Sequence, residues 1–243
     1  MKQSKISFII PALNEAKIIR STIDGLKAYS GPKEIIVSDG GSRDGTPSIA
    51  RNAGAVVTEH RDAERQTIAA GRNAGAKLAN GDFFVFVDAD VTISDIDNFF
   101  AKAFQNFEND NKLVALTCGY KILPEKATLA DKIIFKILSL NFVIFNNFFH
   151  VGLSGGEFQM IRSEAFQKLH GFNQSLVAAE DGDMFSRLGK IGRTKCDISL
   201  SIYHSGRREH AIGWPRLIYQ WMRNYLTVQF FRRSWSKEWT EVR

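Results

Sequence analysis

The sequence predicts an α/β fold in which a mostly parallel sheet is covered by helices on both faces. Short apolar runs alternate with stretches of helical spacing through the first half of the chain. The runs are almost continuously apolar, which is typical of parallel strands buried on both faces. The 243 residues, of which 44% are hydrophobic, suffice for one globular domain with a modest extension.

The expected strands are short apolar runs bounded by Pro, Gly, Asp or Asn, at residues 6–10, 34–37, 55–58, 83–87 and 113–117. The expected helices between them cover residues 15–28, 46–52, 63–79 and 94–107. Asp44 and Ser94 are the candidate N-caps of two of these helices. A later strand is expected at residues 197–203. Ligands of parallel sheets bind outside the carboxyl ends of the strands, so the turns after the strands form the candidate site.

Three polar turns follow strands at this expected edge. Asn14 and Glu15 follow the first strand, residues 39–46 (DGGSRDGT) follow the second, and residues 88–90 (DAD) follow the fourth. Each turn alone has a structural explanation, because Asp and Gly are common in turns and helix caps. Their coincidence at one edge favours a binding site.

The order of four motifs resembles the family 2 glycosyltransferases: residues 11–15 (PALNE), 39–46 (DGGSRDGT), 88–90 (DAD) and 180–181 (ED). The resemblance runs from about residue 6 to residue 204. It implies an inverting enzyme with the GT-A fold, a Rossmann-like sheet flanked by helices, and a nucleotide-diphosphate sugar, UDP- or GDP-linked, as donor. We therefore expect a GT-A domain over residues 1–205, divided at residue 119 into a nucleotide-sugar-binding half and an acceptor and catalytic half.

The resemblance also assigns donor-binding residues. It implies that the Asp39 carboxylate accepts a hydrogen bond from the nucleobase. The residues that would shape the nucleoside pocket are Pro11, Ala12 and Glu15. Arg72, within residues 71–75 (GRNAG), looks like the family arginine that pairs with a diphosphate oxygen. A solvated helix position is the structural alternative for Arg72, and Arg65 is a weaker candidate for the same role.

Residues 88–90 form the candidate metal site. Aspartates two residues apart at the end of a strand can approach one divalent ion, which would neutralise a diphosphate leaving group. The resemblance implies that Asp90 contacts the ion and that Asp88 contacts the ribose or a metal-bound water. His204 is similar to the histidine that completes the metal site in some relatives, and a purely structural histidine is the alternative. The expected ion is Mn²⁺ or Mg²⁺, and an imidazole ligand favours Mn²⁺.

Glu180 and Asp181 are the candidate catalytic residues. Inverting displacement onto a hydroxyl needs a base opposite the leaving group, and neighbouring carboxylates raise one another's pKa. The resemblance makes Asp181 the base; an acidic helix N-terminus is the structural alternative. If the acceptor is a phosphate, Asp181 would orient it rather than deprotonate it. Gly156, within residues 153–157 (LSGGE), resembles the small-residue turn that lets the backbone approach the donor sugar.

The net charge of +6 is concentrated after residue 206, where eight Lys and Arg face three Glu and all four tryptophans occur. An apolar stripe there predicts an amphipathic helical tail over residues 206–243: Trp214, Leu217, Trp221, Tyr225 and Val228. Basic and aromatic residues on one helix favour a membrane surface, and packing on the body of the protein is the alternative. Arg207 and Arg208 are candidates for gripping a phosphate.

Residues 137–149 are uncharged and strongly apolar but contain three Asn, and a spanning helix needs roughly 20 apolar residues. We therefore expect no transmembrane helix here. Lys132 and Lys136 precede the segment at helical spacing, which suits a helix at a lipid interface or along an acceptor groove. A core helix over the sheet is the alternative. The apolar run at the N-terminus is too short for a signal peptide, which favours a cytoplasmic protein.

Together these features predict a peripheral enzyme of cell-envelope synthesis at the inner face of the membrane. It would move one sugar to a glycan or lipid-linked acceptor, because we find no clear Gln-x-x-Arg-Trp motif of processive synthases. A sugar-phosphate nucleotidyltransferase is a second hypothesis, disfavoured because the turn after the first strand is acidic rather than Gly-rich and basic. A non-catalytic protein that binds anionic surfaces is a third, and it leaves the carboxylates unexplained. No nucleic-acid partner is expected.

Overall fold

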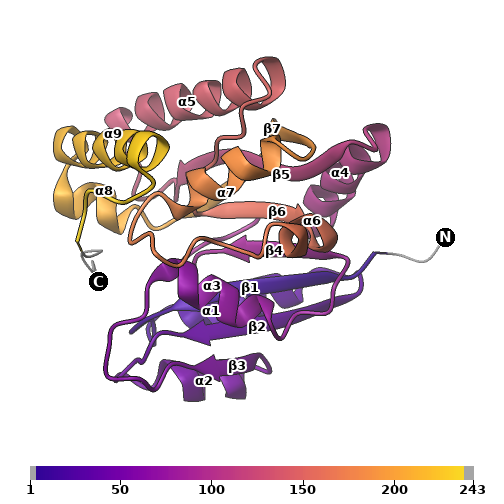
Figure 1. The fold of residues 1–243 in the computed structure, drawn as a ribbon. Helices are drawn as coiled ribbons and strands as arrows, with labels where there is room; N and C mark the ends of the chain where they lie inside the picture. Colours follow the sequence, from indigo (N-terminus) through magenta and orange to yellow (C-terminus); the bar gives the residue numbers. More distant parts are fainter. Residues whose placement is uncertain (1–3, 238–243) are drawn as a thin grey trace.

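The computed structural model describes residues 4–237 and contains a seven-stranded sheet with helices on both faces (Figure 1). The spatial order of the strands is β3-β2-β1-β4-β6-β5-β7. Their bounds are β1 (Ile6–Ala12), β2 (Lys33–Asp39), β3 (Val56–Glu59), β4 (Phe83–Val87), β5 (Leu113–Ile122), β6 (Phe158–Arg162) and β7 (Arg193–His204). The helices are α1 (Ile19–Lys27), α2 (Thr46–Asn52), α3 (Ile68–Ala76), α4 (Ile96–Asn109), α5 (Leu129–Val143), the π-helix η1 (Ile144–Phe148), α6 (Ser163–Lys168), α7 (Glu180–Gly189), α8 (Arg207–Ile212) and α9 (Trp214–Phe231).

The sheet is mostly parallel, as predicted. Strand β1 pairs in parallel with β2 and β4, β2 with β3, and β5 with β7. Strand β6, which the sequence did not indicate, runs antiparallel between β4 and β5. Strands β5 and β7 are longer than expected because they pair with each other across a bulge near Cys118.

Successive side chains of the central strands enter two separate cores, one on each face of the sheet. Phe8 and Ile10 of β1 pack with residues of α1 and α4, such as Phe100. Ile9 lies on the opposite face with residues of α3, α6 and α7, such as Phe185. This alternation confirms that the central strands are buried on both faces, and it explains their continuously apolar sequences.

Helices α1 and α3 begin four and five residues later than predicted because the preceding backbone makes other bonds. Helix α1 starts at Ile19 rather than at residue 15. The backbone amides of residues 14–16 bind side chains of the loop after β2 instead: Ser42, Asp44 and Thr46. Helix α3 starts after Thr67, whose hydroxyl accepts from the Ala70 amide at 3.1 Å.

The predicted caps are each displaced by one residue. Gly45, with φ of 88°, holds the N-cap position of α2, while the Asp44 carboxylate accepts from the Thr46 amide at 3.0 Å. The left-handed φ explains why a glycine occupies this position. Asp95, with φ of 45°, takes the N-cap position of α4 in place of Ser94.

Helices α5 and α9 lie at the β5–β7 end of the sheet (Figure 1). The C-terminal helix is present, and its predicted stripe turns toward the protein: Leu217 and Val228 are buried, and the Trp214 and Trp221 rings stack edge to face at 6.0 Å. Packing on the body therefore accounts for this stripe. Trp239 and the rest of the predicted tail beyond residue 237 lie outside the described residues. Over residues 4–237 we find no helix with the length and hydropathy required to cross a bilayer.

Candidate active site

A cavity of about 1050 Å³ lies at the carboxyl ends of β1, β2 and β4. In the parallel register Ala12 at the end of β1 lies beside Asp39 at the end of β2, and β4 ends on the other side of β1. The three polar turns after these strands therefore meet at one edge. Ten of the eleven predicted site residues line the cavity: Pro11, Ala12, Glu15, Arg72, Asp88, Asp90, Gly156, Glu180, Asp181 and His204.

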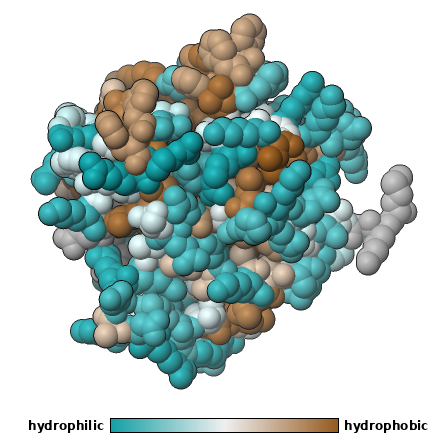
Figure 2. Space-filling view, viewed as in Figure 1, coloured by the Kyte–Doolittle hydropathy of each residue, from teal (hydrophilic) through white to brown (hydrophobic). Residues whose placement is uncertain are grey.

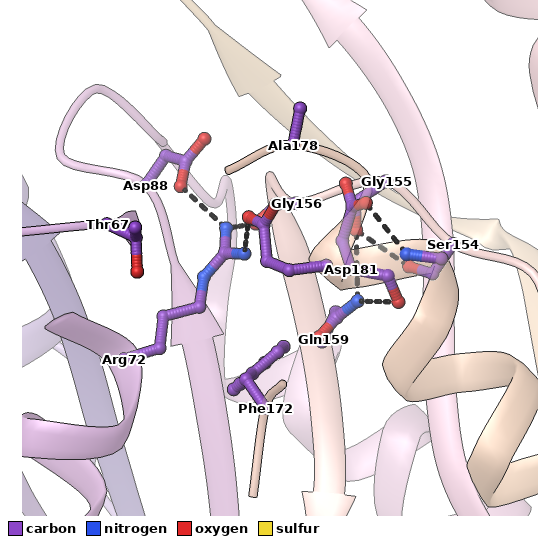
Figure 3. Close-up of polar contacts among 12 residues, drawn as sticks. Thr67, Arg72, Asp88, Ser154, Gly155, Gly156, Gln159, Phe172, Ala178 and Asp181 are labelled. Atoms are coloured by element: carbon purple, nitrogen blue, oxygen red, sulfur yellow. Dashed lines mark hydrogen bonds and ion pairs between the residues drawn. The ribbon is translucent and has the colours of Figure 1, made fainter. Parts of the chain in front are cut away.

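Arg72 of α3 occupies the centre of the charged wall and is buried (Figure 3). Its guanidinium donates to the Glu180 carboxylate at 2.7 Å, to Asp88 Oδ1 at 3.3 Å and to the Gly156 carbonyl at 3.0 Å. Its face lies 5.4 Å from the centre of the Phe172 ring. Burial alone would lower the pKa of Arg72, but Glu180 and Asp88 raise it above its usual value. The alternative of a solvated helix position is therefore wrong for Arg72.

Asp88 follows β4 and points into the cavity beside Arg72 (Figure 3). Its side chain keeps 38% of its surface exposed, but this surface faces the cavity rather than the outside of the protein. The deep position raises the pKa of Asp88 to about 6, although Arg72 opposes the rise. Asp90 and Asp181 add to it by repulsion. The site thus holds several carboxylates near one buried cation.

Glu180 and Asp181 are the first two residues of α7. The acidic helix N-terminus that was the structural alternative is therefore present, and both residues also line the cavity. Burial, followed by repulsion from Asp181, raises the pKa of Glu180 to about 7. Burial also raises the pKa of Asp181, although Arg72 and the Gly182 amide, which donates to Asp181 at 2.7 Å, oppose the rise. Ala179, which precedes the pair, has a left-handed φ of 62°. Such backbone strain in a non-glycine residue is frequent at functional sites.

The turn at residues 154–156 brings backbone close to these carboxylates. A Cβ on Gly156 would lie 2.6 Å from Arg72 Nη2 and 3.4 Å from Asp181 Oδ2, so a side chain here would displace the guanidinium. Two residues that the sequence analysis missed hold the turn. The Tyr120 hydroxyl donates to the Gly155 carbonyl at 3.2 Å, and the Gln159 amide donates to the carbonyls of Gly155 and Asp181, both at 3.3 Å.

A second ion-pair group lies on the same charged side of the cavity. The Arg207 guanidinium donates two hydrogen bonds to the Glu15 carboxylate, both at 3.0 Å, and lies 3.6 Å from Asp90 Oδ2. The hydroxyl and amide of Ser205 also donate to Asp90. Arg207 therefore connects the turn after β1 with the turn after β4. It was a predicted phosphate ligand, and the structure pairs it with carboxylates.

Asp39 is the predicted residue that does not line the cavity, although its neighbours Ser38 and Gly40 do. Its carboxylate accepts from the Gly41 amide at 3.0 Å, from the Ser42 amide at 2.9 Å and from the Ser42 hydroxyl. These bonds form a closed turn after β2. Asp39 is 2% exposed, so a base-reading role would require its carboxylate to become accessible from the cavity.

The donor set of the predicted metal site is present, but it is not assembled. Asp88, Asp90 and His204 line the same cavity. The His204 Nε2 atom is buried and has no hydrogen-bond partner among residues 4–237, and burial lowers the pKa of this imidazole. A neutral imidazole with an unpartnered nitrogen, in a cavity that also holds two carboxylates, has the donor chemistry that a divalent ion requires. Within the described part of the chain, however, no three His, Cys, Asp or Glu side chains are grouped closely enough to hold one as they stand.

The other side of the cavity is apolar. Its lining comes from α5, η1 and α9: Phe135, Leu138, Phe142, Phe145, Trp221 and Tyr225. Glu157, also in the lining, was quoted in a motif but not predicted as a site residue. Burial raises the pKa of Glu157 well above its usual range. No local sequence pattern reveals this burial, because it is created by elements that are distant in the chain.

Comparison with known protein families identifies the family of this chain. A profile described as glycosyl transferase family 2 matches residues 7–169, about two thirds of the chain. The chain belongs to glycosyl transferase family 2. The match confirms the family resemblance that the motifs indicated. It disfavours the two alternative classes, a nucleotidyltransferase and a non-catalytic binding protein.

Individual relatives share only about a quarter of their aligned residues with this chain. The chain is 26% identical over 199 residues to the succinoglycan biosynthesis protein ExoA of Rhizobium meliloti, covering 76% of this chain and 58% of that protein. It is 24% identical over 208 residues to the O-antigen chain rhamnosyltransferase RfbN of Salmonella typhimurium, covering 77% and 62%. The chain therefore spans about three fifths of the length of these relatives.

Solved structures confirm the GT-A-like fold. The mannosyltransferase PcManGT from Pyrobaculum calidifontis, in complex with GDP-Man and Mn²⁺, matches with a TM-score of 0.67 and 21% identity, over 84% of this chain and 57% of that one. TarS 1–349 of S. aureus, in complex with UDP-GlcNAc, matches with a TM-score of 0.60 and 20% identity, over 82% and 58%. At this identity the likeness shows the fold alone.

Proposed function

We propose that this glycosyltransferase family 2 protein moves one sugar from a nucleotide-diphosphate sugar to an acceptor by inverting displacement. One observation carries the proposal: Arg72 holds Asp88, from the end of β4, and Glu180, from the start of α7, on one wall of a single cavity. The carboxylate of the turn after β4 and the carboxylate of the residue that precedes the candidate base are thus held together by one buried cation.

The donor would occupy the charged side of the cavity. Pro11, Ala12 and Glu15 would shape the nucleoside site, and Asp39 would read the base once its buried carboxylate becomes accessible from the cavity. Complexes of structural neighbours with GDP-Man and UDP-GlcNAc support a GDP- or UDP-sugar as donor. We also propose that the catalytic domain has two functional halves, residues 1–119 for the donor and residues 120–205 for the acceptor and catalysis.

Asp181 would act as the base. The acceptor oxygen forms a bond to the anomeric carbon, the bond from that carbon to the diphosphate oxygen breaks, and the acceptor proton passes to the Asp181 carboxylate. Glu180 is occupied by the Arg72 guanidinium and would position Asp181 rather than receive the proton. Arg72 and the Gly156 backbone would orient the donor next to this carboxylate.

Asp88, Asp90 and His204 would hold a divalent ion, Mn²⁺ or Mg²⁺, once a diphosphate is bound. The ion would neutralise the leaving diphosphate. Support comes from the unpartnered His204 nitrogen and from the Mn²⁺ complex of a structural neighbour. Because Asp90 is bonded to Ser205 and lies near Arg207, binding of the ion requires these contacts to loosen.

The apolar side of the cavity would receive the acceptor. Its aromatic and aliphatic lining favours a lipid-linked acceptor, or a glycan carried on an apolar group, over a free sugar. This supports a place in cell-envelope synthesis, with the protein at the inner face of the membrane. We propose no nucleic-acid partner.

A donor screen tests the proposal. The purified protein is incubated with UDP- and GDP-sugars and candidate lipid-linked acceptors, and both nucleoside diphosphate release and the anomeric configuration of the product are measured. We expect release that depends on acceptor and a product of inverted configuration. Pyrophosphate release from a nucleoside triphosphate and a sugar phosphate, without transfer to any acceptor, would contradict the proposal.

A further inference from the structure

Helix α5 and the following η1 present an apolar stripe to the outside of the protein. Its members recur every three or four residues, so they share one helical face: Leu129, Ile133, Ile137, Leu140, Ile144 and Phe148. All are exposed, and Phe148 is 82% exposed. The opposite face of α5 is the one that carries the buried Phe135 and Phe142. The helix is thus apolar both toward the protein and away from it.

Helix α9 has a similar outward stripe. Tyr219, Leu226 and Phe230 are exposed and do not line the cavity, and Phe230 is 76% exposed; Met222, also exposed, lies at the border because it lines the cavity. This face differs from the stripe that the sequence analysis proposed for a membrane, which packs inward. The sequence pattern therefore identified the helix correctly and its outer face incorrectly.

The two stripes belong to neighbouring helices. The Trp214 indole of α9 donates to the Asp131 carboxylate of α5 at 2.7 Å, and the Trp214 ring stacks on Phe135 at 5.3 Å. Figure 1 places α5 and α9 together at the top of the molecule, and Figure 2 shows apolar side chains gathered there. We call the two outward stripes together the α5–α9 face.

The exposed charged side chains on α5 and α9 have one sign. The exposed charged side chains of the two helices are Lys132, Lys136, Arg216 and Arg223. Asp131, the acidic residue of these helices, is buried and bonded to His210 and Trp214. Two further arginines, at 232 and 233, follow α9 and are exposed; Arg232 also lies 3.9 Å from the Asp183 carboxylate. An apolar surface bordered by cations is suited to an anionic lipid interface. The apolar side chains would enter the boundary of the acyl chains, and the Lys and Arg side chains would bind the anionic headgroups.

We propose that the α5–α9 face docks this protein on an anionic membrane surface. A second copy of the chain fits the face less well. Pairing two copies about a two-fold axis would place the lysines and arginines of one copy beside those of the other. Because the inner sides of α5 and α9 line the apolar side of the cavity, docking would bring that side close to the lipid; this consequence rests on the proposed function.

Vesicle co-sedimentation tests the docking face. The protein is mixed with vesicles of phosphatidylcholine alone or of phosphatidylcholine with phosphatidylglycerol. The test variant Leu140→Gln/Leu226→Gln removes side chains that are 56% and 49% exposed and do not line the cavity. The matched control Val56→Gln/Leu78→Gln removes side chains that are 52% and 44% exposed, on β3 and after α3. We expect roughly a tenfold weaker partition for the test variant and no change for the control.

Charge reversal provides the second arm. Lys132→Glu/Lys136→Glu is expected to weaken binding to the anionic vesicles by roughly tenfold, since each cation contributes near a charged surface. The same double reversal at the exposed Lys77 and Lys168 is the control.

The proposal is overturned if the wild-type protein ignores phosphatidylglycerol, or if test and control pairs lose binding equally. It is also overturned if the Leu140→Gln/Leu226→Gln variant changes a dimer to a monomer in sedimentation while vesicle binding is unaltered. Nucleotide binding by the same samples is measured by calorimetry. It depends on the charged side of the cavity, so a failure of the docking proposal is separate from a failure of the proposed function.

Discussion

The two sides of the cavity are built in different ways. The charged side comes from turns at the ends of parallel strands and is cross-linked by Arg72 and Arg207, each paired with carboxylates. The apolar side comes from α5, η1 and α9, which carry apolar residues on inner and outer faces alike. The family match, over residues 7–169, includes the donor turns and α5 but ends before α7 and α9. The family match therefore covers the turns after β1, β2 and β4 and part of the apolar lining, whereas Glu180, Asp181 and α9 lie beyond it.

The largest expected effect is on the charged side. Asp181→Asn keeps the size of the side chain but removes the base, so turnover with a hydroxyl acceptor should fall by about 10³-fold. Donor affinity, measured by calorimetry, should stay within about twofold because Asp181 is proposed to act on the acceptor. Unchanged turnover would remove Asp181 from the mechanism, and an equal loss of donor binding would make it a donor ligand.

Removing the Arg72 guanidinium should lower the free energy of unfolding of the protein. Arg72→Met leaves the buried Glu180 carboxylate without its 2.7 Å partner, and breaking such a pair costs about 3 kcal/mol. Urea unfolding at constant m-value measures the change. The matched control is Arg20→Met, which breaks an exposed pair with Asp24 in α1 and should cost about 0.5 kcal/mol or less. Equal costs for the two variants would show that Arg72 does not hold the wall together.

The charged side should also determine the pH dependence. A base works only when deprotonated, and burial raises the pKa of both Asp181 and Glu180, the latter to about 7. The acid limb of kcat/KM should therefore lie above the usual range of an aspartate, and activity should fall as the pH drops through the raised pKa of Asp181. A limb at pH 4, where ordinary carboxylates titrate, would contradict the environment described here.

The smallest effect is expected on the apolar side. Leu138→Ala removes part of the cavity lining and should raise KM for an acceptor with an alkyl chain by about fivefold, with donor KM unchanged. Ile133→Ala, on the outer face of the same helix, is the control and should leave both constants unaltered in the absence of membranes. An equal effect of both substitutions would indicate a general change in α5 rather than lost acceptor contact.

The same contrast explains what could be predicted from the sequence. The continuously apolar strands indicated the parallel sheet, and parallel register alone brings the turns at Glu15 and Asp88 to one edge. The sequence could not show that Ser42 closes the turn around Asp39, because that bond depends on the path of the loop. It also could not show the burial of Glu157, which depends on elements distant in the chain.

Helix patterning had a similar limit. The stripe from Trp214 to Val228 correctly indicated a helix, but α9 has apolar residues on more than one face. Periodicity alone does not say which of two apolar faces packs inward. Strand β6 was missed because Gln159 interrupts its apolar run, and its place in the sheet depends on β4 and β5 as partners.

The most direct test is calorimetric titration of the protein with UDP and GDP, with and without Mn²⁺. We predict that one of the two nucleotides binds, that Mn²⁺ strengthens its binding by about tenfold or more through charge neutralisation, and that Asp90→Ala abolishes this gain. Absence of binding by either nucleotide under both conditions would contradict the assignment of the charged side as a donor site.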